Sequence, residues 1–296
     1  MGQDGMSINW FPGHMVTART KAAETMRQTD LVIEVLDARA PHASCNPVFE
    51  RLRLAGQRPA LKLLNKSDQA DPEQTRRWLH HYNSQPGVQG IALCAKKAGE
   101  LARVLPACRA LRPDRGAADK PLRMMILGIP NVGKSTLMNA LLKRHVAPVG
   151  DEPAITKIQM FHRLGPGLSL VDTPGMLWPG MAQDTASKLA ATHSVGRAAY
   201  DDEDVALTLG AALLRRYPDL LQRRFGGLPA GCDGHGLLAL IAAGRSLAKK
   251  SGGPDIARAA TSLLNDFRSG ALGRITLETV EEIAPAPGEA GTGENV

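Results

Sequence analysis

The segment from Gly128 to Ser135 reads GIPNVGKS, and its residue types and spacing suit the binding of phosphate. In a GxxxxGKS loop the backbone N–H groups surround phosphate oxygens at the N-terminus of a helix, where the peptide dipoles favour an anion. Lys134 would reach the β and γ phosphates of a nucleotide, and the Ser135 hydroxyl would be a ligand of Mg²⁺. The predicted nucleotide contacts in this loop are Asn131, Val132, Gly133, Lys134, Ser135 and Thr136.

A DTPG motif, Asp172 to Gly175, follows about 40 residues later, an interval that leaves room for a helix, a loop and a hairpin. Asp172 would hold the metal ion through a water molecule, and the N–H of Gly175 would sense the γ-phosphate. A lone DxxG sequence is a common turn. Its distance from the phosphate loop is what makes it a specific signal.

An NKSD motif, Asn65 to Asp68, precedes both of these elements. The carboxylate of Asp68 can accept two hydrogen bonds from guanine that adenine cannot supply, so the motif favours GTP over ATP. Asn65, Lys66 and Ser67 complete the predicted guanine-reading loop. Cys94 and Ala95 follow another strand-like stretch, where a backbone contact to guanine O6 is expected, although the pattern there is loose.

Each motif needs a strand in front of it, and the sequence provides apolar runs at Ala60–Leu64, Leu122–Leu127 and Leu168–Val171. Continuous apolar runs of this length are typical of buried parallel strands. We therefore expect an α/β fold, a mostly parallel sheet with helices on both faces. Because the guanine reader comes before the phosphate loop, the domain is predicted to be a circularly permuted P-loop GTPase domain. Such a permutation is feasible because the chain ends of a compact domain often lie close together.

The second half of the chain differs in character. Residues from Met181 onward are rich in Ala, Leu and Val with helical spacing, and Gly-rich turns separate the segments. We predict three parts: the permuted GTPase domain with its N-terminal WFPGHM segment over residues 1–180, a small all-helical domain that binds RNA or the ribosome over 181–280, and a disordered tail over 281–296.

Composition limits the possible classes. The net charge is +7, and residues 1–180 hold 24 basic and 15 acidic residues, which suits attraction to nucleic acid phosphates. The four cysteines have no CxxC pairing and are expected to be reduced. No long apolar run or signal segment is present, so we expect a cytoplasmic protein without membrane insertion.

Several longer segments resemble the YlqF/RbgA family of circularly permuted ribosome-biogenesis GTPases. The resemblance rests on NWFPGHM, DLVIEVLDARAPHASCNP, NKSD, GIPNVGKST, GDEPAITK, DTPGMLWP, RYPDLLQRRFG and DFRSGALGRITLE, and it covers about residues 8–280. It implies a protein that binds GTP and GDP, hydrolyses GTP to GDP and phosphate, and acts in maturation of the large (50S) ribosomal subunit. Its partners would then be rRNA and ribosomal proteins.

Catalysis departs from the common scheme. Many GTPases have a Gln after DxxG that orients the attacking water, whereas this chain has Met176, whose thioether cannot hold a water in line. The resemblance implies that His14 can take this part, since an imidazole can hydrogen-bond water at neutral pH. A surface or RNA-contacting histidine is an equally reasonable reading of His14.

The resemblance and the loop sequence also suggest ions. In GTPases with Asn at the position of Asn131, K⁺ can lie against the phosphates and supply positive charge, although the residue could instead only stabilise the turn. Thr156 matches the switch threonine that closes on Mg²⁺. The predicted metal ligands are Ser135, Thr156 and Asp172 for Mg²⁺ and Asn131 for K⁺.

Three functions remain open at this point. The first is a GTPase that binds the immature large subunit in its GTP form and leaves after hydrolysis. The second is a GTPase switch whose helical module recruits a protein. The third is a non-hydrolysing rRNA-binding scaffold, which Met176 would permit but which has little need of Lys134, Ser135, Thr156 and Asp172 together.

Overall fold

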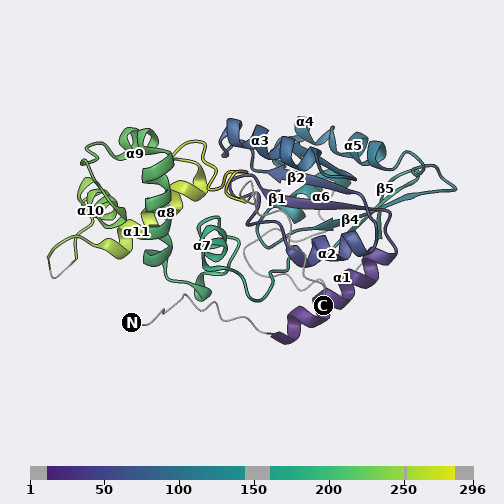
Figure 1. Cartoon of the computed structure of the whole chain (residues 1–296), viewed down its shortest axis with the longest axis horizontal. Coiled ribbons are helices and arrows are strands. Elements are labelled where there is room, and N and C mark those ends of the chain that lie inside the picture. The colour runs from purple at the N-terminus through teal and green to yellow at the C-terminus, as the bar shows by residue number, and fades with distance from the viewer. Residues whose placement is uncertain (1–11, 144–160, 250–251, 284–296) are drawn as a thin grey trace, which may run out of the picture.

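A computed structural model describes residues 12–143, 161–249 and 252–283, and the side chains of residues 12–16 and 18 lie outside this description. Its centre is a six-stranded sheet in the order β3-β2-β1-β4-β6-β5 (Figure 1). All neighbouring strands are parallel except β5 and β6, which form an antiparallel pair. The strands are β1 (Leu31–Asp37), β2 (Ala60–Asn65), β3 (Val88–Ala92), β4 (Leu122–Leu127), β5 (Phe161–Gly165) and β6 (Leu168–Asp172).

Helices cover both faces of this sheet. Alternate residues of β1 point to opposite faces, so Ile33 and Val35 pack on one side while Val32 packs on the other. The first face is covered by α4 (Ala98–Leu101), α5 (Val104–Leu111) and α6 (Lys134–Leu142). The second is covered by α1 (Pro12–Arg27), α2 (Pro47–Ala55) and α3 (Pro72–Asn83). Burial on both faces explains why the strand sequences are continuously apolar.

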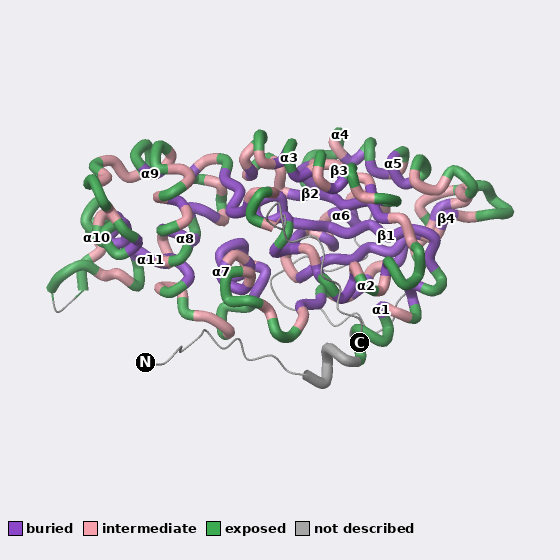
Figure 2. Tube along the Cα trace, in the orientation of Figure 1, coloured by how far each residue is buried: buried purple, intermediate pink, exposed green. Residues whose placement is uncertain are grey.

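The remaining helices form a second group beside the sheet (Figures 1 and 2). They are α7 (Gln183–Ala191), the short 3₁₀ helix η1 (Arg197–Ala199), α8 (Asp202–Arg216), α9 (Pro218–Phe225), α10 (Gly234–Gly244) and α11 (Ile256–Ser269). The carboxylate of Asp201 caps α8 by accepting from Glu203 N and Asp204 N. Apolar residues of α11 at helical spacing, including Leu263 and Phe267, are buried against the neighbouring helices.

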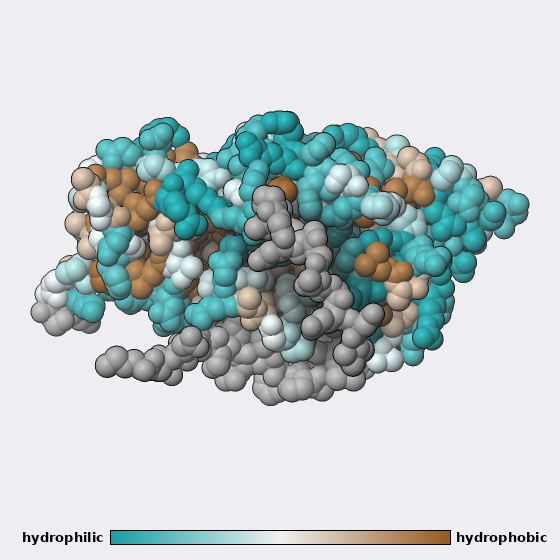
Figure 3. Space-filling model, viewed as in Figure 1, coloured by the Kyte–Doolittle hydropathy of each residue, from teal (hydrophilic) through white to brown (hydrophobic). Residues whose placement is uncertain are grey.

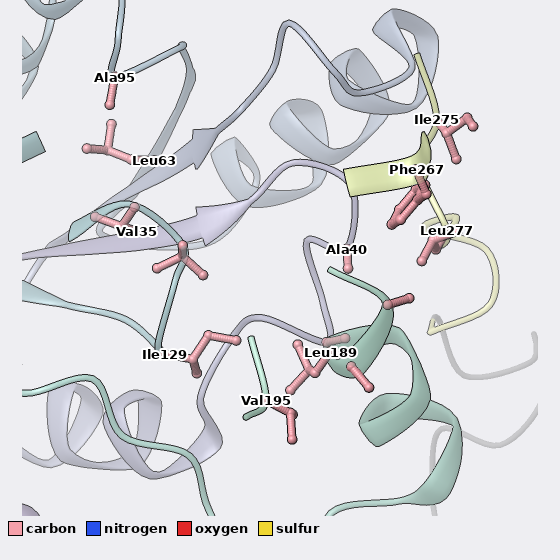
Figure 4. Close-up of a cluster of buried hydrophobic side chains, with 14 of the residues drawn as sticks. Val35, Ala40, Leu63, Ala95, Ile129, Leu189, Val195, Phe267, Ile275 and Leu277 are labelled. Atoms are coloured by element: carbon pink, nitrogen blue, oxygen red, sulfur yellow. The ribbon is translucent and has the colours of Figure 1, made fainter. Parts of the chain in front are cut away.

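The chain after α11 returns to the sheet. Ile275 N donates to Gln69 O at 2.9 Å, Leu277 N donates to Arg39 O at 2.7 Å, and the indole of Trp78 donates to Glu278 O at 3.2 Å. The two halves also share one buried cluster, whose members Val35 and Ile129 lie with Leu189, Val195 and Leu277 in Figure 4. The domain boundaries at residues 180 and 280 remain a prediction. Residues 284–296 of the predicted tail lie outside the described residues.

None of the helices within the described ranges combines the length and the apolar character that a bilayer crossing requires. The face seen in Figure 3 is largely hydrophilic, with apolar residues in view mainly over the helical group. Among large apolar side chains of the described residues, only Leu54 and Phe161 are exposed.

Candidate nucleotide-binding site

Every predicted nucleotide motif follows a strand of the parallel sheet at its carboxyl end. The NKSD loop follows β2, Cys94 follows β3, the phosphate loop follows β4, and DTPG begins in the last residue of β6. Because these strands are parallel neighbours or near neighbours, their ends meet at one edge of the sheet, which is where open α/β folds bind ligands.

The phosphate loop connects β4 to α6 through two glycines that no larger residue could replace. A Cβ added to Gly133, which has φ of 102°, would lie 2.2 Å from Asn65 Nδ2. A Cβ added to Gly128 would lie 2.6 Å from Val35 O. Gly133 is also the N-cap residue of α6 and has no side chain to cap it, so the N–H groups of the first turn can bind an anion.

Lys134 begins α6 with its side chain inside the loop. It is only 8% exposed, and its ammonium donates to Ile129 O at 2.8 Å. Burial lowers the pKa of Lys134 to about 8, and the nearby charge of Asp172 only partly opposes that effect. The loop therefore holds a desolvated ammonium that a phosphate group would stabilise in its charged form.

Asp172 has the features of a metal-binding carboxylate. Among the described residues, its Oδ1 atom is buried without a hydrogen-bond partner. Burial raises the pKa of Asp172, although Lys134 and the Thr173 N–H lower it in part. A buried oxygen without a partner is costly, and a hydrated Mg²⁺ beside Ser135 would satisfy it.

The rest of DTPG is held against the phosphate loop. A Cβ added to Gly175 would lie 2.8 Å from Lys134 Nζ and 3.0 Å from Pro130 N. Asn46, the N-cap of α2, donates its side-chain amide to Met176 O at 2.8 Å. The Met176 side chain is 6% exposed and packs in the apolar cluster under α1 and α2, away from the nucleotide site.

Asn65 connects three loops of the site. Its Nδ2 donates to Val132 O at 2.7 Å, and its Oδ1 accepts from Ala95 N at 2.9 Å. Val132 itself is fully buried in the core, so its side chain does not face the site. The predicted guanine reader thus supports the phosphate loop directly.

Lys66 is paired at the base of the NKSD loop. It adopts φ of 59°, and its ammonium lies 2.8 Å from Asp37 Oδ2, at the end of β1. Asp37 also receives a bidentate interaction from Arg39, with Nη2 at 2.8 Å. Burial alone would raise the pKa of Asp37, but these two cations hold it well below its usual range.

The backbone N–H groups of Cys94 and Ala95, in the loop after β3, already have hydrogen-bond partners within the protein. Cys94 N donates to Glu100 Oε2 at 2.7 Å, and Ala95 N donates to Asn65 Oδ1. Burial raises the pKa of the Cys94 thiol, which keeps the thiol protonated near neutral pH. A contact from this pair to guanine O6 would have to share an N–H group or fall to the next residue, Lys96.

The NKSD loop, the loop of Cys94 and Ala95, and the phosphate loop line a cavity of about 650 Å³, within the usual range for ligand sites. Asp172 and Gly175 of DTPG are not among its lining residues. The predicted residues that line it are Asn65, Lys66, Asp68, Cys94, Ala95, Asn131, Gly133, Lys134, Ser135 and Thr136. Residues not predicted from the sequence also line it: Arg39, Gln69, Lys96, Thr192, His193, Arg197, Asn265 and Arg268. Arg39 and Arg268 lie within segments that carry the family resemblance, and Gln69 and Lys96 directly follow predicted residues, so these four could have been suspected. Thr192, His193, Arg197 and Asn265 come from the helical group, and no local pattern marks them.

Two predicted residues cannot be placed by their side chains. His14 lies in the first turn of α1, but its side chain is outside the described part of the chain. Thr156 lies outside the described residues altogether. Their roles stay predictions, as do the roles assigned to the other site residues. Ser67 is not among the cavity residues.

Comparisons with known proteins agree with this geometry. A family model described as "50S ribosome-binding GTPase" matches residues 123–209. Ribosome biogenesis GTPase A of Bacillus cereus is 33% identical over 285 residues, which cover 94% of this chain and 95% of that protein. Ribosome biogenesis GTPase A of Priestia megaterium is 34% identical over 286 residues, covering 94% of this chain and 98% of that protein.

A solved structure has a similar fold. GDP-bound YlqF from T. maritima superimposes with a TM-score of 0.64 at 26% identity, covering 88% of this chain and 99% of that one. The predicted fold class, a circularly permuted P-loop GTPase fold with a helical C-terminal region, is therefore confirmed.

Proposed function

The chain belongs to the ribosome biogenesis GTPase A family, and from this membership we propose that it acts on the large ribosomal subunit. It is a GTP-hydrolysing ribosome assembly factor. The large subunit is supported by the description of the matched family model and by the basic charge of residues 1–180, which suits rRNA phosphates. We place its action in the cytoplasm, where bacterial ribosomes assemble.

One observation supports the proposed GTP site most strongly. Asp68, the predicted guanine reader, and Lys134, the predicted phosphate ligand, line the same cavity although they stand far apart in the sequence. Asn65 joins their loops through its hydrogen bond to Val132 O. A base bound at Asp68 would therefore direct its phosphates towards the N-terminus of α6.

We propose that Ser135, Asp172 and Thr156 hold Mg²⁺ with the nucleotide. The buried and unpartnered Oδ1 of Asp172 supports this assignment, and Ser135 lines the cavity at the start of α6. When bound, Mg²⁺ neutralises charge that develops on the β and γ phosphates during phosphoryl transfer. The protein's own part is to position the phosphates with Lys134 and the α6 amides.

Asn131 is the proposed K⁺ ligand. Its Nδ2 donates to His193 O at 2.9 Å, which fixes the amide and leaves Oδ1 as its cation-binding atom. Its φ of 59° also fits the alternative that Asn131 only stabilises the turn, because Asn tolerates this region. Hydrolysis rates in matched K⁺ and Na⁺ buffers distinguish K⁺ binding by Asn131 from a role only in the turn. Faster hydrolysis in K⁺ would support K⁺ binding, and equal rates would leave only the turn-stabilising role.

His14 is proposed to position the attacking water. Met176 is buried in the cluster that also contains Ala22 and Met26 of α1, so α1 passes beside the DTPG segment. The first turn of α1, which carries His14, belongs to the same helix. Substitution His14→Ala should preserve GTP binding and remove most stimulated hydrolysis, whereas His80→Ala, on the exposed side of α3, should change neither.

Co-sedimentation tests the choice of subunit. We expect the protein loaded with a non-hydrolysable GTP analogue to pellet with purified large subunits, and to do so much less when loaded with GDP. Small subunits are the matched control. Equal pelleting with both subunits would contradict the assignment to the large subunit, and pelleting with neither would favour a protein partner.

A further inference from the structure

The nucleotide cavity has a wall that comes from the helical group. Thr192, His193, Arg197, Asn265 and Arg268 line it together with the GTPase motifs. We propose that Arg197, in η1, is a ligand of the nucleotide phosphates that the helical group supplies within the same chain. The inference rests on guanine nucleotide occupying this cavity.

Contacts of the neighbouring residues place Arg197 at the phosphate end. Asn131 in the phosphate loop donates to His193 O at 2.9 Å, and η1 begins four residues after His193. The other wall residues, Asn265 and Arg268, belong to α11, whose end lies towards the guanine reader. A Cβ added to Gly270, just after α11, would lie 3.3 Å from the Gln69 side chain, and Arg274 donates to Ser67 O at 3.1 Å.

The other two arginines that line the cavity, Arg39 after β1 and Arg268 in α11, are engaged in structural contacts. Arg39 is 2% exposed and is bound to Asp37 through two hydrogen bonds from its guanidinium. Arg268 donates to Ala190 O and Ala191 O at the end of α7, at 2.9 and 3.1 Å. Neither guanidinium can turn to a ligand without losing these partners.

Arg197 is held differently. Its side chain is 60% exposed and makes an ion pair with Asp202, with Nη2 and Oδ2 2.5 Å apart. An exposed pair of this kind contributes little to stability. Asp202 would also keep a partner if Arg197 left, because Thr261 Oγ1 donates to the same carboxylate at 3.0 Å.

A nucleotide phosphate is the stronger partner for this guanidinium. Arginine binds phosphate through paired, charge-assisted hydrogen bonds, and the partly enclosed cavity screens them less than bulk water does. Phosphate binding would therefore draw Arg197 from Asp202 into the cavity. The helical group would then contact the phosphates directly through Arg197, in addition to its hydrogen bond with Asn131 through His193 O.

Equilibrium binding of fluorescent GDP and of a non-hydrolysable GTP analogue tests this proposal. We expect Arg197→Ala to weaken both by about tenfold or more, and Arg197→Lys to lose less. Asp202→Asn frees Arg197 and should leave affinity unchanged or increase it. Arg223→Ala removes an exposed arginine on α9, outside the cavity, and should have no effect.

The outcomes separate the possible explanations. Unchanged affinity in Arg197→Ala would overturn the inference while leaving the GTP site intact. Equal weakening by Arg197→Ala and Asp202→Asn would also overturn it, since it would mean that the ion pair only holds η1 in place. Failure of the unmodified protein to bind guanine nucleotide would refute the GTP site itself and the inference with it.

Discussion

The charge state of Lys134 is expected to change when a nucleotide binds. In the nucleotide-free protein burial lowers its pKa to about 8, so near pH 8 roughly half of these side chains are neutral. Bound phosphates stabilise the ammonium and raise this pKa again. Nucleotide binding near pH 8 should therefore be accompanied by proton uptake.

Calorimetry can measure this uptake. We expect GDP binding at pH 8 to take up about half a proton, seen as a dependence of the binding enthalpy on the buffer's ionisation enthalpy. The uptake should decline towards pH 6.5, where Lys134 is already charged before binding. Arg223→Ala, which lies outside the cavity, is a control that keeps Lys134 and should keep the uptake. A binding enthalpy independent of buffer at pH 8 would contradict the low pKa.

Asn65 is predicted to matter for structure as well as for the base. Asn65→Ala leaves Val132 O and Ala95 N without their partner, and each such loss costs about 1–3 kcal/mol. Urea unfolding should show a loss of roughly 2 kcal/mol or more, together with weaker GDP binding. Asn83→Ala removes a hydrogen bond to Gly90 N far from the cavity and should lower stability without changing GDP affinity.

Several of these residues could be identified from the sequence, and others could not. Gly133, Lys134 and Asp68 belong to motifs in which local spacing alone determines the chemistry. The contact of Asn131 with His193 depends on how the helical group packs, which no local spacing encodes. The same reason explains why Arg197 was not predicted from the sequence.

At the scale of elements, the end of β1 is joined to the helical group by Arg39. Its guanidinium pairs with Asp37, lies over the ring of Phe267 at 5.2 Å, and donates to Thr192 O at 3.4 Å. Breaking a buried pair by removing one partner costs about 3–5 kcal/mol, because a buried charge remains. Lys66 would still neutralise Asp37 in part.

A double-mutant cycle tests this connection. We expect Arg39→Met to lower the free energy of unfolding by about 3 kcal/mol. Adding Asp37→Asn should recover part of that loss, since the uncompensated carboxylate is gone. Additive losses in the double variant would show that the two side chains act independently.

β2, β4 and β6 were predicted from apolar runs that each precede a recognised motif, and β3 from the strand-like stretch before Cys94. β1 precedes no such motif and was not predicted as a strand. The parallel pairing of these strands agrees with their burial on both faces of the sheet. β5 was only implied, as half of the hairpin before DTPG. Its partly exposed residues carry no apolar run, and pairing with β6 defines it. Sequence periodicity reports burial, so it misses an edge strand of this kind.

At the scale of the whole molecule, the return of residues 274–283 to the sheet is the main feature that the sequence did not reveal. Trp78 is fully buried and donates to Glu278 O, and Glu278 accepts from His42 N and Ala43 N. These contacts join residues about 200 positions apart. The structure thus connects residues on both sides of the guanine reader to the segment that follows α11.

The burial of Met176 and the contact between the helical group and the phosphate loop suit a GTPase whose hydrolysis depends on its partner. Met176 is buried in the apolar cluster under α1 and α2, so its side chain does not take the place of the water-orienting Gln. The helical group contacts the phosphate loop through Asn131 and His193. A ribosomal subunit bound to the helical group or to α1 could therefore change the catalytic geometry directly.

The rate of GTP hydrolysis should be measured with and without large ribosomal subunits, in K⁺ buffer with Mg²⁺, because it shows whether this GTPase acts on that subunit. We expect slow hydrolysis by the protein alone and a rate at least tenfold higher with large subunits, but not with small ones. A rate that large subunits leave unchanged, from protein that binds GTP normally, would contradict this expectation.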